Sequence, residues 1–153
     1  MRIPNWLNEN NVDFELIPHR TTYDAQRLAA AIHVTGRDVA KTVLLRAGGG
    51  DYIVAVLPAN KTIDLERTSQ LLGEDALELA TEIEISQHCP DCEMGSLPPF
   101  GSQYGMRTLL DESLSQDDEV VFEGNTHQEA IRMKFDDFVR IEQPLIGSFA
   151  RAN

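Results

Sequence analysis

The sequence predicts an α+β fold, in which a largely antiparallel sheet is flanked by helices. Two observations carry this prediction. Segments with the period of strands are joined by turns, as 39–46 and 52–57 are joined by a Gly-rich turn at 47–51. Segments with a helical spacing of apolar residues, such as 64–72, lie between these groups of strands. Hairpins separated by helices are typical of the α+β class.

The N-terminal half is expected to begin with a helix at 4–10 and a half-buried strand at 12–17. Thr22 is the expected cap of a second helix, which is expected to stop near Val34 with Gly36 as the terminating residue. The hairpin follows. Residues 58–61 then break the sheet, with Lys61 as a solvated loop charge.

The C-terminal half is expected to continue the alternation of helices and strands. The helix at 64–72 ends before Gly73, and Thr81 and Glu84 have the spacing of a capping box that opens a short helix toward Gln87. The remaining expected elements are short strands at 76–80, 107–110, 119–123 and 129–134, a closing helix at 135–141 and a loosely attached tail at 142–153.

The length and composition indicate one compact unit. A chain of 153 residues is the size of a single domain, which we expect to cover 1–153, with 1–18 forming the N-terminal helix and strand. No apolar run is long enough to span a bilayer, and the N-terminus lacks the apolar segment of a signal peptide. We therefore expect a cytoplasmic protein with no membrane partner. In that reducing compartment Cys89 and Cys92 would remain thiols.

The charge balance argues against nonspecific binding to nucleic acid. The formal net charge is −12, from 13 Lys and Arg against 25 Asp and Glu, and the basic residues are scattered without any run. A nucleic-acid substrate would therefore have to be held through few phosphate contacts.

The stretch from Cys92 to Gly101 can neither continue a helix nor form a central strand. Gly95 and Gly101 permit a positive φ, while Pro98 and Pro99 fix two φ angles and remove two N–H donors. The amides of Gly95, Ser96 and Leu97 have no strand partner implied by the sequence. A stiff loop with such amides can hold a carbonyl or a developing oxyanion. On composition alone a rigid connector is the favoured interpretation.

Lys41 interrupts an apolar row within the strand 39–46. Alternation places it on the same face as Val39, Val43 and Leu45, where an unpaired ammonium costs several kcal/mol unless it opens into a wet cleft. Such a lysine serves a function or is an inward-pointing edge charge that opposes aggregation. The pattern alone leaves both interpretations open.

The cysteines and histidines are weaker signals. Cys89 and Cys92 have a metal-like spacing, but only His88 lies close by and there is no second cysteine pair, so we expect no metal. His19 at a strand end and His127 after a turn are more often structural or exposed residues than catalysts. No Walker, Rossmann or Gly-x-Ser-x-Gly motif is present, which excludes the common nucleotide hydrolases, dehydrogenases and serine hydrolases.

Several landmarks occur together in a specific order. Their combination resembles the YbaK-like, prolyl-tRNA-synthetase-associated editing domains, which carry Gly-x-x-x-Pro in the loop, and the resemblance runs from about His19 to Val139. The landmarks are His19 followed by Thr21 or Thr22, Lys41-Thr42, Leu57-Pro58-Ala59-Asn60-Lys61, the loop from Cys92 to Gly101, Asp111-Glu112-Ser113-Leu114, and Gly124-Asn125-Thr126-His127 before Ile131-Arg132-Met133.

The resemblance implies a curved, partly closed sheet and a free-standing deacylase that hydrolyses the ester of a mischarged aminoacyl-tRNA without a cofactor. Alanine and cysteine on tRNA for proline are the family's commonest targets. Lys41 matches the family's lysine and His127 its Gly-x-x-His, so both are expected to be catalytic. The expected substrate-binding residues are Gly95, Ser96, Leu97, Pro98, Pro99, Thr42, His19 and Tyr23.

The expected partners are the 3′ end of an aminoacyl-tRNA and, in some members, an aminoacyl-tRNA synthetase. Contact with the 3′ end alone needs few phosphate contacts, which suits an acidic chain. A rival interpretation is a noncatalytic module that binds a nucleotide, an aminoacyl group or a synthetase-like partner, because it would retain the same loop.

Overall fold

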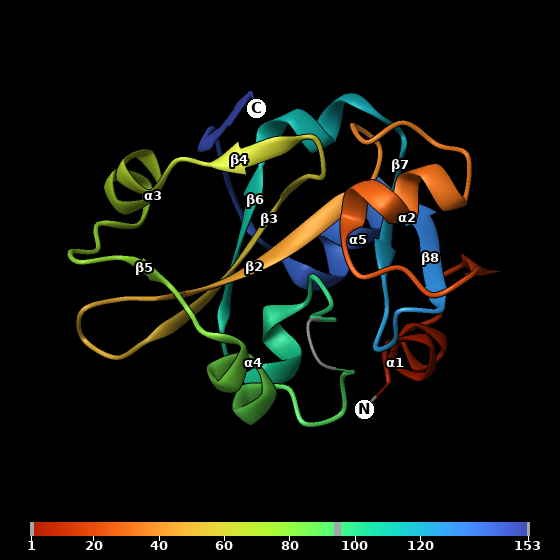
Figure 1. Ribbon diagram of the computed structural model, residues 1–153, viewed down its shortest axis with the longest axis horizontal. Coiled ribbons are helices and arrows are strands. Elements are labelled where there is room, and N and C mark those ends of the chain that lie inside the picture. The colour runs from red at the N-terminus through yellow and green to blue at the C-terminus, as the bar shows by residue number, and fades with distance from the viewer. Residues whose placement is uncertain (1, 94–95, 153) are drawn as a thin grey trace.

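The structure is a computed structural model that describes residues 2–93 and 96–152. Its mixture of helices and mostly antiparallel strands confirms the predicted α+β class (Figure 1). The helices are α1 (Ile3–Glu9), α2 (Ala25–Ala31), α3 (Leu65–Leu72), α4 (Glu82–His88) and α5 (Phe135–Glu142), with short 3-10 helices η1 (Gly101–Tyr104) and η2 (Glu112–Gln116).

The strands form three sheets. The largest has the order β5-β2-β3-β6-β9, a second has the order β1-β8-β7, and β10 pairs with β4. The pairs β3–β6 and β6–β9 are parallel, and the other strand pairs are antiparallel. The strands are β1 (Phe14–Pro18), β2 (Ala40–Arg46), β3 (Tyr52–Pro58), β4 (Lys61–Ile63), β5 (Glu78–Leu79), β6 (Arg107–Asp111), β7 (Glu119–Glu123), β8 (Glu129–Lys134), β9 (Leu145–Gly147) and β10 (Ala150–Ala152).

The β2–β3 hairpin is the centre of the fold and is apolar on both faces. One face packs into the main core with β7, β8, α5 and α1, while the other packs against Phe149, Leu77 and the α3 residues Leu65 and Leu72. An isolated parallel bridge between Val39 and Val121 joins the hairpin to the three-stranded sheet, and α2 covers this junction through Leu28 and Ala29. The junction lets the two larger sheets surround one core.

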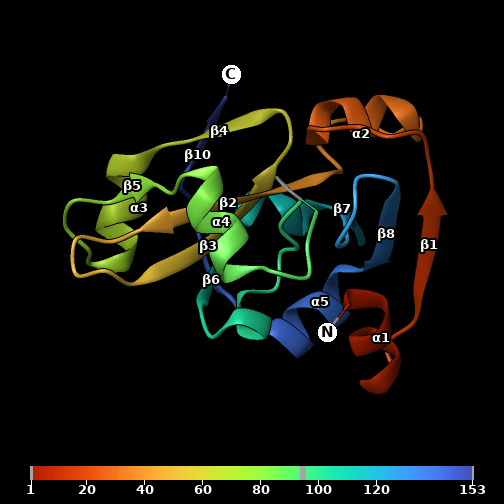
Figure 2. The ribbon, with the colours of Figure 1, turned by 60° about the horizontal axis from the view of Figure 1, so that its bottom comes forward.

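The three-stranded sheet forms one end of the molecule. Figure 2 shows α1 and α2 at opposite ends of β1, while α3 and β4 lie at the far side of the hairpin. The two larger sheets thus meet close to α2.

The second helix begins later than the sequence predicts. Its cap is Asp24, whose carboxylate accepts a hydrogen bond from the Arg27 amide at 2.7 Å. Thr22, the expected cap, instead donates its amide to the carbonyl oxygen of His127, and its side chain is buried. This bond holds residue 22 outside the helix, so the prediction for Thr22 is wrong.

The C-terminal tail is integrated into the fold, contrary to the expected loose attachment of 142–153. β9 extends the largest sheet, and β10 pairs with β4, which begins at Lys61, the last residue of the expected break at 58–61 (Figure 1). Lys61 consequently lies in a strand and is half-buried rather than in a solvated loop. Phe149, which lies between β9 and β10 in the sequence, is fully buried. Burial of this apolar side chain stabilises the attachment of the tail.

No helix among residues 2–93 and 96–152 is long and apolar enough to cross a membrane.

Candidate functional site

A pocket of about 210 Å³ opens at the junction of the two larger sheets. Lys41 and Thr42 of β2 form one wall, Tyr23 and Asp24 precede α2, Leu97 comes from the Pro-rich loop, and Glu123 ends β7. The complete lining is Tyr23, Asp24, Ala25, Ala40, Lys41, Thr42, Leu97 and Glu123. Four residues predicted from the sequence, Lys41, Thr42, Tyr23 and Leu97, thus converge here.

Lys41 enters the pocket as a half-buried cation. Partial burial lowers the pKa of its ammonium from the ordinary value, because the charged form loses hydration. The hydrogen bonds and ion pairs of the described residues provide no partner for it, although the Glu123 carboxylate lines the same pocket. An unneutralised ammonium in a pocket is suited to hold an anionic group.

His127 lies behind the pocket wall rather than in it. Its side chain is buried, its Nδ1 is 3.0 Å from Glu123 Oε2, and its ring centroid is 5.0 Å from that of Tyr23. His127 therefore contacts two residues of the lining and reaches the pocket through them.

Glu123 is a site residue that the sequence interpretation missed. Burial raises the pKa of its carboxyl group, and the contact with His127 only partly offsets this effect. The available signal was a carboxylate at the end of an apolar strand, four residues before His127. The turn at 124–125 folds the two side chains together, so sequence spacing alone could have suggested the pair.

The Pro-rich loop forms a pocket wall and is anchored in the main core. Phe100 is fully buried, with ring centroids 5.0 Å from Trp6, 5.4 Å from Phe122 and 5.1 Å from Phe138. The next residue must be glycine, because a Cβ at Gly101 would lie 2.6 Å from Thr108 Oγ1. Phe100 and Gly101 thus fix the C-terminal end of the loop against the core.

Only part of the expected amide cluster is available for a ligand. The Ser96 amide donates to the Glu93 carbonyl oxygen at 2.9 Å, and its hydroxyl donates to the Gly124 carbonyl oxygen at 3.0 Å. Within the described part of the chain the Leu97 amide has no hydrogen-bond acceptor. Gly95 lies outside the described residues. Leu97 lines the pocket, and its amide is the member of the cluster with no acceptor among the described residues.

The remaining predicted site residues lie away from the pocket. Pro98 and Pro99 are buried in the loop and do not contribute to the lining. His19 donates its backbone amide to the Gln128 carbonyl oxygen at the end of β1, and its ring contacts the Arg20 carbonyl oxygen. His19 is therefore not among the residues that line the pocket with Lys41.

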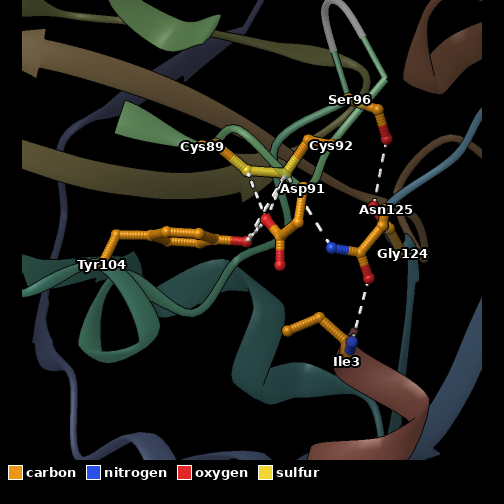
Figure 3. The surroundings of a disulfide bond; sticks show 8 residues. All are labelled: Ile3, Cys89, Asp91, Cys92, Ser96, Tyr104, Gly124 and Asn125. Carbon is orange, nitrogen blue, oxygen red and sulfur yellow. Dashed lines mark hydrogen bonds between the residues drawn. A yellow bond between two sulfur atoms is a disulfide. The ribbon is translucent and has the colours of Figure 1, made fainter. Parts of the chain in front are cut away.

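The cysteines depart from the expected thiol form. Cys89 and Cys92 are joined in a disulfide at the start of the loop, with Asp91 and Tyr104 in contact with it (Figure 3). The helix α4 ends at His88 and the chain turns back at once, which brings the two sulfur atoms together. Asn125 contacts Cys92 with its side chain and accepts the Glu93 amide with its carbonyl oxygen, so the disulfide borders the turn between Glu123 and His127.

Comparison with known proteins places the sequence in one family. A family model described as an aminoacyl-tRNA editing domain matches residues 19–141. The multifunctional Ser/Thr-tRNA deacylase ProXp-y of Escherichia coli (strain K12) is 23% identical over 149 residues, which cover 95% of this chain and 89% of that protein.

Solved structures share the fold at low sequence identity. The hypothetical protein APE2540 superposes with a TM-score of 0.89 at 17% identity, covering 97% of this chain and 99% of the other. A candidate trans-editing enzyme for prolyl tRNA synthetase superposes with a TM-score of 0.80 at 19% identity, covering 91% and 87%. These two likenesses establish a shared fold.

Proposed function

Because this chain belongs to the aminoacyl-tRNA editing domain family, we propose that it is a free-standing deacylase that hydrolyses the ester bond of a mischarged aminoacyl-tRNA. The observation that carries the proposal is the unneutralised Lys41 ammonium beside the Leu97 amide in one small pocket. A cation and a fixed N–H donor are the groups that stabilise the oxyanion of ester hydrolysis.

The reaction needs no protein nucleophile, because an aminoacyl ester is already activated. Water adds to the carbonyl carbon, the bond to the ribose oxygen breaks, and that oxygen leaves with a proton. The Lys41 ammonium attracts the negative charge of the tRNA 3′ end and of the carbonyl oxygen as it becomes an oxyanion. The Leu97 amide donates to the same oxygen. The exposed ring of Tyr23 at the pocket mouth offers a surface on which the terminal base stacks.

His127 is assigned a positioning role in this proposal. Its ring is buried and does not line the pocket, but it contacts both Glu123 and Tyr23. It therefore acts by fixing the orientation of these two side chains. His19 has no part in the reaction, since it lies outside the pocket lining.

The pocket favours small amino acids with a polar side chain. A volume of about 210 Å³ leaves little room for a side chain once the terminal ribose is seated. The Thr42 hydroxyl can bond a substrate hydroxyl, which an alanine side chain cannot use. We therefore place serine and threonine ahead of the alanine and cysteine expected from the sequence. The Escherichia coli relative is named for the same two amino acids.

A panel of charged tRNAs tests the proposal. The purified protein is incubated with tRNAs carrying serine, threonine, alanine, cysteine or phenylalanine, and release of amino acid is compared with spontaneous hydrolysis. We expect turnover of the small amino acids, fastest for serine or threonine, and none for phenylalanine. Binding of charged tRNA without turnover of any ester would overturn the enzyme assignment in favour of a noncatalytic module. Repeating the panel with prolyl-tRNA synthetase present tests whether a synthetase is a partner.

A further inference from the structure

We propose that Glu123 binds the α-ammonium group of the aminoacyl ester and so selects an amino acid over other acyl groups. The inference rests on the proposed deacylase function and names how that site recognises its substrate. Glu123 ends β7, and its carboxylate lines the pocket. Within the described chain it forms no ion pair with an arginine or a lysine.

The pocket holds two opposite charges that do not neutralise each other. Lys41 and Glu123 both line it, yet no ion pair joins them among the described residues. An aminoacyl-tRNA has the matching arrangement, with a positive α-ammonium next to the ester and negative phosphates beyond the ribose. With Lys41 on the anionic side, Glu123 is left for the ammonium, and the reacting carbonyl then lies between them.

Glu123 suits this role better than Asp24, the other carboxylate of the lining. The Asp24 side chain is 52% exposed, caps α2 and pairs with the Arg27 guanidinium at 3.3 Å. The Glu123 side chain is only 14% exposed. A charge-assisted hydrogen bond is stronger where water is excluded, so an arriving ammonium gains more from Glu123.

The Glu123 carboxylate also has capacity for another donor. Its Oε2 contacts His127 Nδ1, Oε1 meets the Thr22 hydroxyl at 3.5 Å, and the Ser96 side chain also hydrogen-bonds to the carboxylate. A carboxylate offers about four lone-pair sites, so Oε1 can accept an N–H from the substrate while His127 keeps its contact. Burial raises the pKa of this carboxyl group, which a bound cation would reverse.

The test compares seryl-tRNA with the matching 2-hydroxyacyl-tRNA, in which a hydroxyl of similar size replaces the ammonium. Each rate is normalised to the spontaneous hydrolysis of the same ester. We expect the wild type to prefer seryl-tRNA by about tenfold to a hundredfold in kcat/KM, the value of a charge-assisted hydrogen bond. In Glu123→Gln, which still accepts a bond from His127, the preference should fall to about twofold or less.

Asp24→Asn is the matched comparison, because it removes the other pocket carboxylate while retaining a capping side chain. It should keep the preference for the ammonium. Equal hydrolysis of both esters by the wild type, or loss of the preference in Asp24→Asn alone, would overturn the assignment to Glu123 and leave the deacylase proposal standing. If the protein hydrolyses neither of these esters and no other ester of the panel, the deacylase proposal itself is wrong. The wild type alone shows whether the ammonium ester is preferred, so the inference stays testable even if Glu123→Gln folds poorly.

Discussion

At the scale of single residues, Lys41 carries the clearest sign of function. Partial burial lowers the pKa of its ammonium, so the charged form is less favourable here than in water. No ion pair among the described residues offsets that cost, although the Glu123 carboxylate lines the same pocket. A charged side chain whose burial lowers the stability of the fold is typical of binding and catalytic sites.

We expect Lys41→Ala to lower kcat/KM for the best tRNA substrate by about tenfold to a hundredfold, because one charge-assisted contact is lost from the transition state. Its melting temperature should stay equal or rise, since a poorly solvated charge has been removed. Lys134→Ala is the control, as Lys134 is exposed at the start of α5. A Lys41→Ala protein that melts early while its folded fraction hydrolyses normally would instead indicate an architectural lysine.

At the scale of elements, Asp111 attaches the tail to the largest sheet. Its Oδ1 accepts the Phe149 and Ala150 amides at 3.0 and 2.9 Å, and its other oxygen accepts from Ser113. Burial by itself raises the pKa of Asp111, but these hydrogen bonds outweigh it and hold the pKa below the ordinary value. The motif from Asp111 to Leu114, which resembles a family landmark, thus has a structural explanation.

Asp111→Ala should lower the free energy of unfolding by about 2–6 kcal/mol, since two buried tail amides lose their acceptor at about 1–3 kcal/mol each. The pH dependence follows from the depressed pKa. The ionised Asp111 stabilises the wild type above the unfolded carboxyl pKa of about 3.9, and this contribution disappears as pH falls through the lower folded value. Thermal melts from pH 7 to pH 2 should show this acid loss in the wild type and a smaller one in Asp111→Ala. The exposed Asp13→Ala serves as control, and equal stability of all three proteins would contradict the tail attachment.

At the scale of the whole molecule, the acidic balance limits how tRNA can be held. The net charge is −12, and several arginines pair with acids on the surface, among them Arg46 with Glu78 and Glu84, and Arg107 with Glu74. A protein of this kind repels most of a polyanion. Contact confined to the 3′ end is consistent with this charge.

We therefore expect kcat/KM to depend weakly on salt. Contact with one or two phosphates of a single strand gives a slope of about −0.7 to −1.4 in a plot of log kcat/KM against log salt, and screening of the acidic surface makes it shallower. Lys41→Ala should flatten the slope further. Rates measured from about 50 to 500 mM salt check this, and a slope of −4 or steeper would mean that the protein grips much more of the tRNA.

Local patterns in the sequence determined most of the elements. The capping box at Thr81 and Glu84, the 47–51 turn and the helical spacing of 64–72 all recur in the structure, because each depends on residues close together in the chain. The position of Lys41 on an apolar row also marks it as unusual from the sequence, although the pattern leaves its role open. The stiffness of the Pro-rich loop follows from its composition in the same way.

Only the tertiary structure decided which distant segments meet. The sequence predicts a loosely attached tail because strands as short as β9 and β10 have no recognisable pattern of their own. They form only by pairing with β6 and β4, with Phe149 buried between β9 and β10. The placement of Glu123 in the pocket, the exclusion of His19 from it and the disulfide between Cys89 and Cys92 likewise depend on how α2, β7 and the loop pack. Burial gives these side chains their chemistry, and burial is a property of the assembled core rather than of any short stretch of sequence.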